Sequence, residues 1–324
     1  MFVLKVLGAV IFILLLFIAG WVYTKWQSSL TIEQLRDYVQ KTIALEDGTT
    51  AHYRDAGDPS NPTLLLIHGG MDNLYAWDIW TKELSERYRV ISVDLPGHGL
   101  TDPAPKRDYG RWLFAEFIDK FTRTLDLKDF TIVGNSYGGE TAIRYVVDTP
   151  GRAKALVLID SGGFLGGDGS VEDGAPTFER MVKLASSVPG VNYILDHILL
   201  AILGQQSNYN HVNTYFTDDH NTRFNRISRY EKNRGTIREL AMHGAKTYRD
   251  IEGLEKINIP TLILWGELDG TLPVKLAHRF DKAIPESQLI IYPGIGHMPQ
   301  MENPKKSAAD LDAFIQKRVM SPSQ

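Results

Sequence analysis

A serine lies between two glycines in the run Gly134-Asn135-Ser136-Tyr137-Gly138. The run follows a β-branched and apolar stretch at 130–133, which predicts a buried strand, and residues 139–147 have helical spacing. Glycines on either side of Ser136 let the strand and helix backbones come close and let the serine adopt a strained conformation. The pattern predicts a sharp turn that exposes the serine hydroxyl as a nucleophile at the carboxyl end of a sheet.

A serine hydroxyl is a poor nucleophile at neutral pH, so it requires a nearby base, and that base benefits from a carboxylate that orients it. His297 stands in a glycine-rich loop directly after the last predicted strand, and Asp269 follows the predicted strand before it. Both positions belong to the edge that presents Ser136, so we expect the three side chains to meet there. Asp160, at the end of an earlier predicted strand, and Glu267 are alternative acids, and Asp269 is favoured over both.

The surrounding elements alternate between strands and helices, which predicts a doubly wound, mostly parallel sheet. An Asp-Gly turn separates two alternating stretches at 42–48 and 50–56, so the domain opens with an antiparallel hairpin. The apolar stretch at 63–67 has the composition of a central parallel strand. Further strands are predicted at 89–95, 130–133, 155–160, 261–265 and 288–292, and a closing helix runs to about residue 317.

One connection is far longer than a crossover requires. About a hundred residues separate Asp160 from Thr261, and they include helical patterns at 176–187 and 191–203. We predict a helical cap, or lid, over 162–250. Within it, residues 194–203 are apolar nearly all round, which fits a helix packed in the cap or, alternatively, the wall of a lipophilic pocket or a contact with lipid.

The amino-terminal stretch at 6–23 carries no charged residue. Its length approaches the thickness of a bilayer's hydrocarbon core, about 30 Å. Three aromatic residues lie where a membrane interface would be, namely Trp21, Tyr23 and Trp26. A cleaved signal peptide is the competing interpretation, but its small-residue cleavage pattern is poorly matched. We therefore predict an uncleaved single-pass anchor in 1–26, hence a membrane protein, and a short amphipathic linker helix in 27–41. Basic residues flank both sides, so they leave the orientation open.

The composition of the chain limits the classes of function that remain possible. The chain has 324 residues, of which 43% are hydrophobic and 23% charged, and its net charge is -4 with a pI near 6.1. These values give no electrostatic case for binding nucleic acid. Because the chain has no cysteine, disulfides, thiolate catalysis and cysteine-based metal sites are excluded.

The order Ser136, Asp269, His297 is that of the α/β-hydrolases, and the chain resembles this superfamily in its lid-bearing lipase and esterase branch. The resemblance covers roughly 42–318 and implies a core made of 42–161 and 251–319. Besides the serine turn, it rests on His68-Gly69-Gly70, Asp94-Leu-Pro-Gly-His-Gly99, Trp265-Gly-Glu-Leu-Asp269 and Gly296-His297.

The resemblance assigns the loop at 68–70 to an oxyanion hole, whose donors would be the backbone amides of Gly70 and Tyr137. It implies acyl transfer through a Ser-His-Asp triad, with no metal and no organic cofactor. The apolar anchor and cap favour a lipophilic ester of the monoacylglycerol type, with membrane lipid as a further partner. Carbon-carbon hydrolases of ring-cleavage products, which have similar Gly-Asn-Ser turns, are the enzymatic alternative. A non-catalytic binding or scaffold protein is the alternative from another class.

Overall fold

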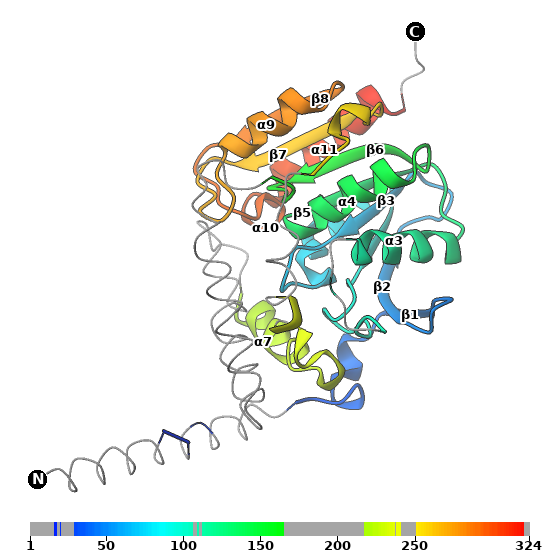
Figure 1. Ribbon diagram of the computed structural model, residues 1–324, viewed down its shortest axis with the longest axis vertical. Helices are drawn as coiled ribbons and strands as arrows, with labels where there is room; N and C mark the ends of the chain where they lie inside the picture. The colour runs from blue at the N-terminus through cyan, green and yellow to red at the C-terminus, as the bar shows by residue number, and fades with distance from the viewer. Residues whose placement is uncertain are drawn as a thin grey trace, which may run out of the picture.

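The computed structural model describes residues 16, 17, 20, 29–105, 109, 112–164, 217–236, 238–240 and 251–320. The strands are β1 (Lys41–Ala44), β2 (Thr50–Ala56), β3 (Thr63–Ile67), β4 (Arg89–Val93), β5 (Phe130–Asn135), β6 (Ala153–Ile159), β7 (Thr261–Gly266) and β8 (Ser287–Tyr292). They form one sheet in the order β1-β2-β4-β3-β5-β6-β7-β8 (Figure 1). β2 pairs antiparallel with both β1 and β4, and every other neighbouring pair is parallel.

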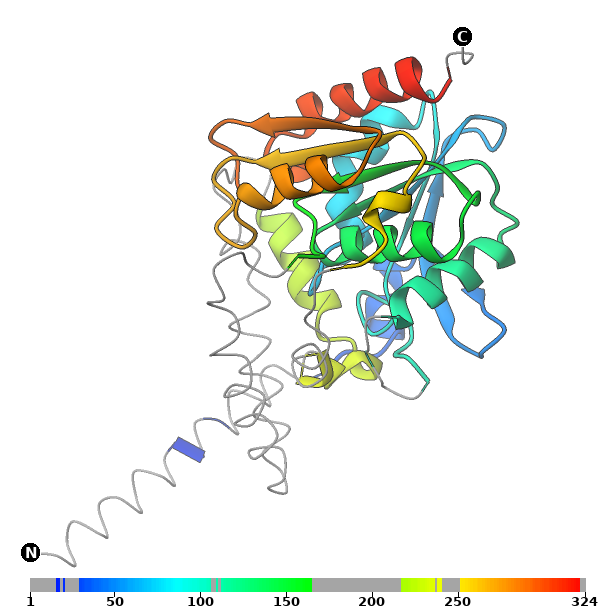
Figure 2. The same ribbon diagram turned by 45° about the horizontal axis from the view of Figure 1, so that its top comes forward.

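Helices cover the sheet on both faces. The α-helices are α2 (Asp78–Leu84), α3 (Leu113–Thr124), α4 (Tyr137–Asp148), α7 (Asp218–Ile227), α9 (Lys275–Ala283), α10 (Pro299–Glu302) and α11 (Pro304–Arg318). Short 3-10 helices are η1 (Glu33–Tyr38), η2 (Leu74–Trp77), η4 (Glu231–Asn233) and η5 (Leu254–Lys256). Helices α3, α4 and α9 pack on one face and α2 and α11 on the other (Figure 2).

The two faces arise from the alternation of side chains along each strand. In β3, Leu65 and Ile67 belong to the core beneath α3 and α4, whereas Leu64 and Leu66 belong to the core beneath α2 and α11. All four side chains are almost completely buried. A central parallel strand is buried on both sides, and this is why β3 has no polar alternation.

The strand predictions agree with the observed sheet. The hairpin of β1 and β2 turns at Gly48, whose φ is +84°, a value that glycine adopts without strain. β5 ends at Asn135 and α4 begins at Tyr137, so Ser136 is the single residue between strand and helix. β6 ends at Ile159, which places Asp160 just beyond the strand.

The linker differs from its prediction. Within the predicted linker helix of 27–41, the described residues form only the six-residue 3-10 helix η1. Its one fully buried side chain is Leu35, so there is no continuous apolar face to support a longer α-helix. The segment packs on α7, because Leu35 shares an apolar cluster with Ile227 and the side chain of Arg226 donates to the carbonyl of Gln34. Just before it, Leu30 exchanges backbone hydrogen bonds with Arg229 and Glu231, which follow α7.

Two predicted regions fall mainly outside the described residues. Only residues 16, 17 and 20 of the predicted anchor in 1–26 are described, and no helix in the described segments is long and apolar enough to cross a bilayer. Most of the predicted cap, including the helical patterns at 176–187 and 191–203, is likewise outside them. The anchor and the cap therefore stay predictions.

Candidate active site

Ser136 has a strained backbone. Its φ of 53° and ψ of -117° lie in a region that residues with a side chain rarely occupy. The glycines on either side make this turn possible. A Cβ on Gly134 would lie 2.2 Å from the carbonyl oxygen of Gly138, and a Cβ on Gly138 would lie 2.3 Å from that of Ile67. Both contacts are with backbone, so neither glycine can be replaced without moving the turn.

Hydrogen bonds from the neighbouring strand end hold the strained residue in place. The amide of Ser136 donates to the carbonyl of Ile159 at 2.9 Å, and the carbonyl of Ser136 accepts from Gly139 at 3.0 Å and from Gly162 at 2.9 Å. The side chain is half-buried. The backbone is thus fixed on both sides while the hydroxyl retains access to solvent or substrate.

Asp269 and His297 form a buried pair. The Nδ1 atom of His297 lies 2.7 Å from Oδ2 of Asp269, and each residue is 6% exposed. The other oxygen of Asp269 accepts from the amides of Thr271 at 2.7 Å and Leu272 at 2.9 Å. An ionised carboxylate only accepts hydrogen bonds, so Nδ1 carries the hydrogen and Nε2 is the basic nitrogen of the neutral ring.

Asn135 connects this pair to the serine turn. Its side-chain Nδ2 donates to the carbonyl of His297 at 3.2 Å and to that of Ile159 at 3.1 Å. Because Asn135 directly precedes Ser136, the histidine loop is fixed to the nucleophile's own backbone. We did not predict this role from the sequence. The signal was an amide side chain at the last position of a buried strand, where an apolar residue is expected.

Glu302 holds the histidine loop from the other side. Its Oε2 accepts from the amide of Gly296 and its Oε1 from the amide of Met298, each at 3.0 Å. These two amides flank His297 in the chain, and Glu302 is 3% exposed. The carboxylate therefore accepts hydrogen bonds from two backbone amides that would otherwise be buried without a partner.

The predicted oxyanion loop lies against the serine turn. A Cβ on Gly69 would be 3.3 Å from Cβ of Ser136, and a Cβ on Gly70 would be 3.7 Å from Cβ of Tyr137. Tyr137 opens α4, where the first-turn amides point out of the helix end. The structure thus brings together the two residues whose amides were predicted as oxyanion donors.

His68, which begins this loop, is a structural residue. Its Nδ1 donates to the carbonyl of Gly69 at 2.7 Å and its Nε2 accepts from the amide of Leu95 at 3.0 Å. Burial lowers the pKa of His68, so the ring stays neutral and keeps this pair of hydrogen bonds.

The structure distinguishes the three candidate acids by their contacts. Glu267 is exposed and accepts from the amide of Gly294 rather than from His297. Asp160 is completely buried beside Asp269 and His297, and one ligand atom from each of the three lies within 4.8 Å of the others. The hydrogen bond to Nδ1 belongs to Asp269, so the favoured acid is the one that the geometry pairs with the histidine.

Comparison with known proteins supplies the family. The sequence profile described as the alpha/beta hydrolase fold matches residues 62–304. The chain belongs to the α/β-hydrolase fold family. In this fold the nucleophile stands at a strand-to-helix turn and the triad follows the chain order of serine, acid and histidine, which is the arrangement of Ser136, Asp269 and His297.

Relatives of this α/β-hydrolase have different activities. It is 29% identical to the 2-hydroxy-6-oxo-6-(2'-aminophenyl)hexa-2,4-dienoic acid hydrolase of Metapseudomonas resinovorans, over 87% of this chain and 92% of the relative. It is 26% identical to Lipase 3 of a Moraxella species, over 86% and 85%. Among solved structures, a candidate lipase of Acinetobacter baumannii matches with a TM-score of 0.71 and 25% identity, over 88% of this chain and 94% of that one.

A metal ion is a poor fit to the acid and histidine cluster of this α/β-hydrolase. Asp160, Asp269 and His297 are close enough to share an ion. However, Asp269 already accepts hydrogen bonds at both of its oxygens, and the Nδ1 atom of His297 is used in one of them. The contacts of Asp269 and His297 are therefore those of a hydrogen-bonded acid and base, with Nδ1 of the histidine already committed to the carboxylate.

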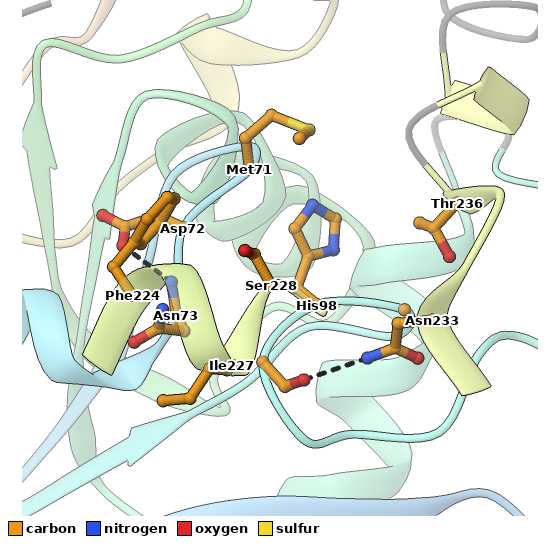
Figure 3. Close-up of a pocket in the computed structure, with 11 residues that line it drawn as sticks. Met71, Asp72, Asn73, His98, Phe224, Ile227, Ser228, Asn233 and Thr236 are labelled. Carbon is orange, nitrogen blue, oxygen red and sulfur yellow. Dashed lines mark hydrogen bonds between the residues drawn. The ribbon is translucent and has the colours of Figure 1, made fainter. Parts of the chain in front are cut away.

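A small cavity adjoins the oxyanion loop of the α/β-hydrolase core (Figure 3). It has a volume of about 50 Å³ and lies where the loop after Gly70, the turn around His98 and helix α7 meet. Met71 and His98 face it from the core, and Phe224 and Ile227 face it from α7. Burial lowers the pKa of His98 to about 3, so its ring is neutral at physiological pH. The cavity therefore has an apolar side, and its remaining lining is polar and includes Asp72, Asn73, Ser228, Asn233 and Thr236.

Proposed function

We propose that this protein is a serine hydrolase that cleaves carboxylic esters through an acyl-enzyme. One observation carries the proposal: the buried Asp269–His297 pair is tied by Asn135 to the strained turn that presents Ser136. A hydroxyl nucleophile, a base in a fixed tautomer and a carboxylate that orients the base are the components that acyl transfer by serine requires.

In the first step, Oγ of Ser136 attacks the ester carbonyl while Nε2 of His297 removes the hydroxyl proton. The oxyanion accepts hydrogen bonds from the amides of Gly70 and Tyr137, and each such donor is worth about 3 kcal/mol in the transition state. His297 then returns the proton to the departing alcohol. Water, deprotonated by the same nitrogen, attacks the acyl-enzyme and releases the acid and Ser136. Asp269 stays ionised throughout and stabilises the imidazolium.

For the substrate, we propose a lipophilic acyl ester, such as a monoacylglycerol, supplied from a membrane in which the chain is anchored. The apolar run at 6–23 and the apolar stretch at 194–203 support this proposal. One similar protein is described as a lipase and another as a candidate lipase. The apolar wall that α7 adds beside the oxyanion loop also suits the uncharged part of such an ester.

Labelling with a fluorophosphonate probe tests the reaction type. The full chain in detergent should be labelled at Ser136, and Ser136→Ala should abolish the labelling. Ser161→Ala is a matched control, because Ser161 follows the next strand but is fully buried and donates to the carbonyl of Gly162. A folded protein that is not labelled would support the non-catalytic scaffold alternative instead.

A series of esters with increasing acyl chain length tests the substrate class. We expect kcat/KM of the detergent-solubilised chain to rise from short to medium and long acyl chains, because each buried methylene adds about 0.8 kcal/mol of transfer free energy. Equal or faster turnover of short, water-soluble esters would count against the lipophilic substrate. It would leave the serine hydrolase proposal unaffected.

Carbon-carbon hydrolysis is a second candidate, favoured by the relative at 29% identity that acts on a hexa-2,4-dienoic acid. Turnover of a vinylogous diketone acid, with Ser136→Ala as control, would identify this chemistry. We expect such a substrate to be cleaved much more slowly than a medium-chain ester. The reverse order would replace the ester proposal.

A further inference from the structure

Asp160 occupies an unusual position next to the proposed triad. It follows β6 with a φ of 41°, so its backbone is in the left-handed region that most residues with a side chain avoid. Its amide donates to the carbonyl of Leu264 at 3.0 Å, and its Oδ1 accepts from the amide of Gly266 at 2.9 Å. These bonds fix a fully buried carboxyl group against β7.

The hydrogen bonds of the two neighbouring acids are unequal. Asp269 accepts from two backbone amides and from His297. Asp160 accepts one amide at Oδ1, and no N–H or O–H group of the described residues donates to its Oδ2. Two adjacent buried carboxyl groups cannot both ionise without a large cost. The proton therefore belongs on the acid with fewer donors.

The other titratable groups around Asp160 favour the same distribution of charge. The carboxyl group of Asp160 faces the carboxylate of Asp269 and the imidazole of His297. It also interacts with the carboxylate of Glu302 and the phenol of Tyr292. Burial, and then the charge of Asp269, raise the pKa of Asp160 well above its usual value. The protonated oxygen can donate only to an acceptor, and the carboxylate of Asp269, which shares a 4.8 Å cluster with Asp160, is the acceptor that interacts with it most strongly.

We propose that Asp160 is a positioning residue that carries a proton at neutral pH and donates it in a hydrogen bond to the carboxylate of Asp269. The bond holds Asp269 toward Nδ1 of His297 and keeps a single negative charge in this pair of acids. His297 can then release its proton to the leaving group, which a second negative charge would hinder. The catalytic consequence rests on the proposed function, whereas the proton itself does not.

Infrared spectroscopy of the full chain at neutral pH detects the proton directly. The C=O stretching band of a protonated buried carboxyl should be present in the native protein and absent in Asp160→Asn. Asp55→Asn is the control, because Asp55 pairs with Arg89 and its side chain is an ionised carboxylate, so its removal should leave the band unchanged. A native protein without the band, or a band that survives Asp160→Asn, would overturn the proposal.

Kinetics test the positioning role. Asparagine is an isostere of the protonated acid: its oxygen can accept from Gly266 and its amide can donate to Asp269. We expect Asp160→Asn to keep kcat within about threefold, and Asp160→Ala to lower kcat by about ten- to a hundredfold with KM unchanged. Melting temperatures establish that both variants are folded. Equal losses in both variants would contradict the role that we assign to the donated hydrogen bond.

The pH profile distinguishes the neutral acid from an ionised one. If Asp160 were ionised, replacing it by asparagine would move the acid limb of kcat/KM to lower pH by about one unit, since a charge beside the base would be lost. We expect no such movement. The infrared band does not depend on turnover, so failure of this inference can be told apart from failure of the proposed function, which the fluorophosphonate probe tests.

Discussion

Two aspartate–histidine pairs of nearly identical construction lie within the described residues, and one of them, Asp269–His297, is tied to the turn that carries Ser136. In both, Nδ1 of the histidine is 2.7 Å from Oδ2 of the aspartate, and both pairs are buried. Each aspartate also accepts two backbone amides, which are those of Leu74 and Leu100 at Asp94 and those of Thr271 and Leu272 at Asp269.

The pairs differ in what surrounds the histidine. His52 stands in β2, and its Nε2 accepts from the amide of Gln40 at 2.9 Å, so both ring nitrogens are occupied, Nδ1 by the carboxylate of Asp94 and Nε2 by a backbone amide. His297 stands in a loop that Asn135 ties to the serine turn. A short aspartate–histidine distance is therefore no sign of catalysis by itself. The position of the second ring nitrogen relative to a nucleophile decides the role.

Replacing the two histidines should have opposite consequences, and this is the largest effect that we predict. His297→Ala should lower kcat/KM of the folded protein by about 10⁵-fold, because it removes the proposed general base. His52→Ala leaves a buried carboxylate without its partner, so it should cost about 3 kcal/mol of unfolding free energy and leave kcat of the folded fraction within a few-fold. Ester kinetics and thermal melts measure both. Loss of kcat in folded His52→Ala would remove the distinction between the pairs.

Replacing the aspartate of each pair should also affect different properties, activity at Asp269 and stability at Asp94. Asp269→Asn should lower kcat by about 10⁴-fold, because an amide favours the wrong histidine tautomer. Asp94→Asn should instead lower stability. The carboxylate now accepts hydrogen bonds from two backbone amides and from the ring N–H of His52. The NH₂ group of asparagine would face one of these donors, and that hydrogen bond would be lost. Kinetics at a temperature where both variants are folded provide the measurement. Similar kcat values in the two variants would show that Asp269 is not the orienting acid.

Glu302→Gln should have a smaller effect on the same loop. Glutamine has one acceptor oxygen, so either Gly296 or Met298 would lose its hydrogen bond and the loop would shift. We expect about tenfold lower kcat and nearly constant KM, because small displacements of a catalytic group reduce rate before binding. Glu286→Gln is the control, since Glu286 is exposed and pairs with Arg318 on the surface. An unchanged kcat in Glu302→Gln would mean that the loop around His297 keeps its position without both hydrogen bonds to Glu302.

Stability should vary with pH in opposite directions at the two buried aspartates, and this is the smallest effect. The pKa of Asp160 is raised, so its contribution to stability is present below about pH 4 and is lost as pH rises toward the folded pKa. Burial alone would raise the pKa of Asp94, but His52 and the amide of Leu100 outweigh burial and lower it. Its contribution is present above about pH 4 and is lost as pH falls.

Melting temperatures between about pH 2 and 8 check this difference. Relative to the native protein, Asp160→Asn should gain stability as pH rises above about 4, and Asp94→Asn should lose stability as pH rises toward about 4. Parallel curves for the two variants would indicate that both carboxyl groups are in the same protonation state.

Local patterns were sufficient for the sheet and for the acid and histidine that the structure pairs, whereas the meeting of Ser136 with His297 stays a prediction. Ser136, Asp269 and His297 each follow a strand that composition and spacing identify, and the family order does the rest. The linker was wrong in detail because one buried leucine, Leu35, cannot support the amphipathic helix that its neighbours suggested. Its packing on α7 involves residues almost two hundred positions away, which no local pattern can indicate.

The supporting contacts could not be predicted for the same reason. Asn135 bonds to His297 across 162 positions, and the His52–Asp94 pair joins segments 42 positions apart. Asp160 was noticed only as a rival acid, because the sequence gives its place at a strand end but not its distance from Asp269. Protonation depends on that distance and on burial, and both are properties of the folded chain.

The close approach at Gly138 limits how this enzyme core can be redesigned. Helix α4 touches the carbonyls of Ile67 and His68 there, so main chain rather than side chain shapes that side of the site. Side-chain substitutions can instead be made in the cavity beside the loop after Gly70, where Phe224 and Ile227 line the wall and can be exchanged one at a time.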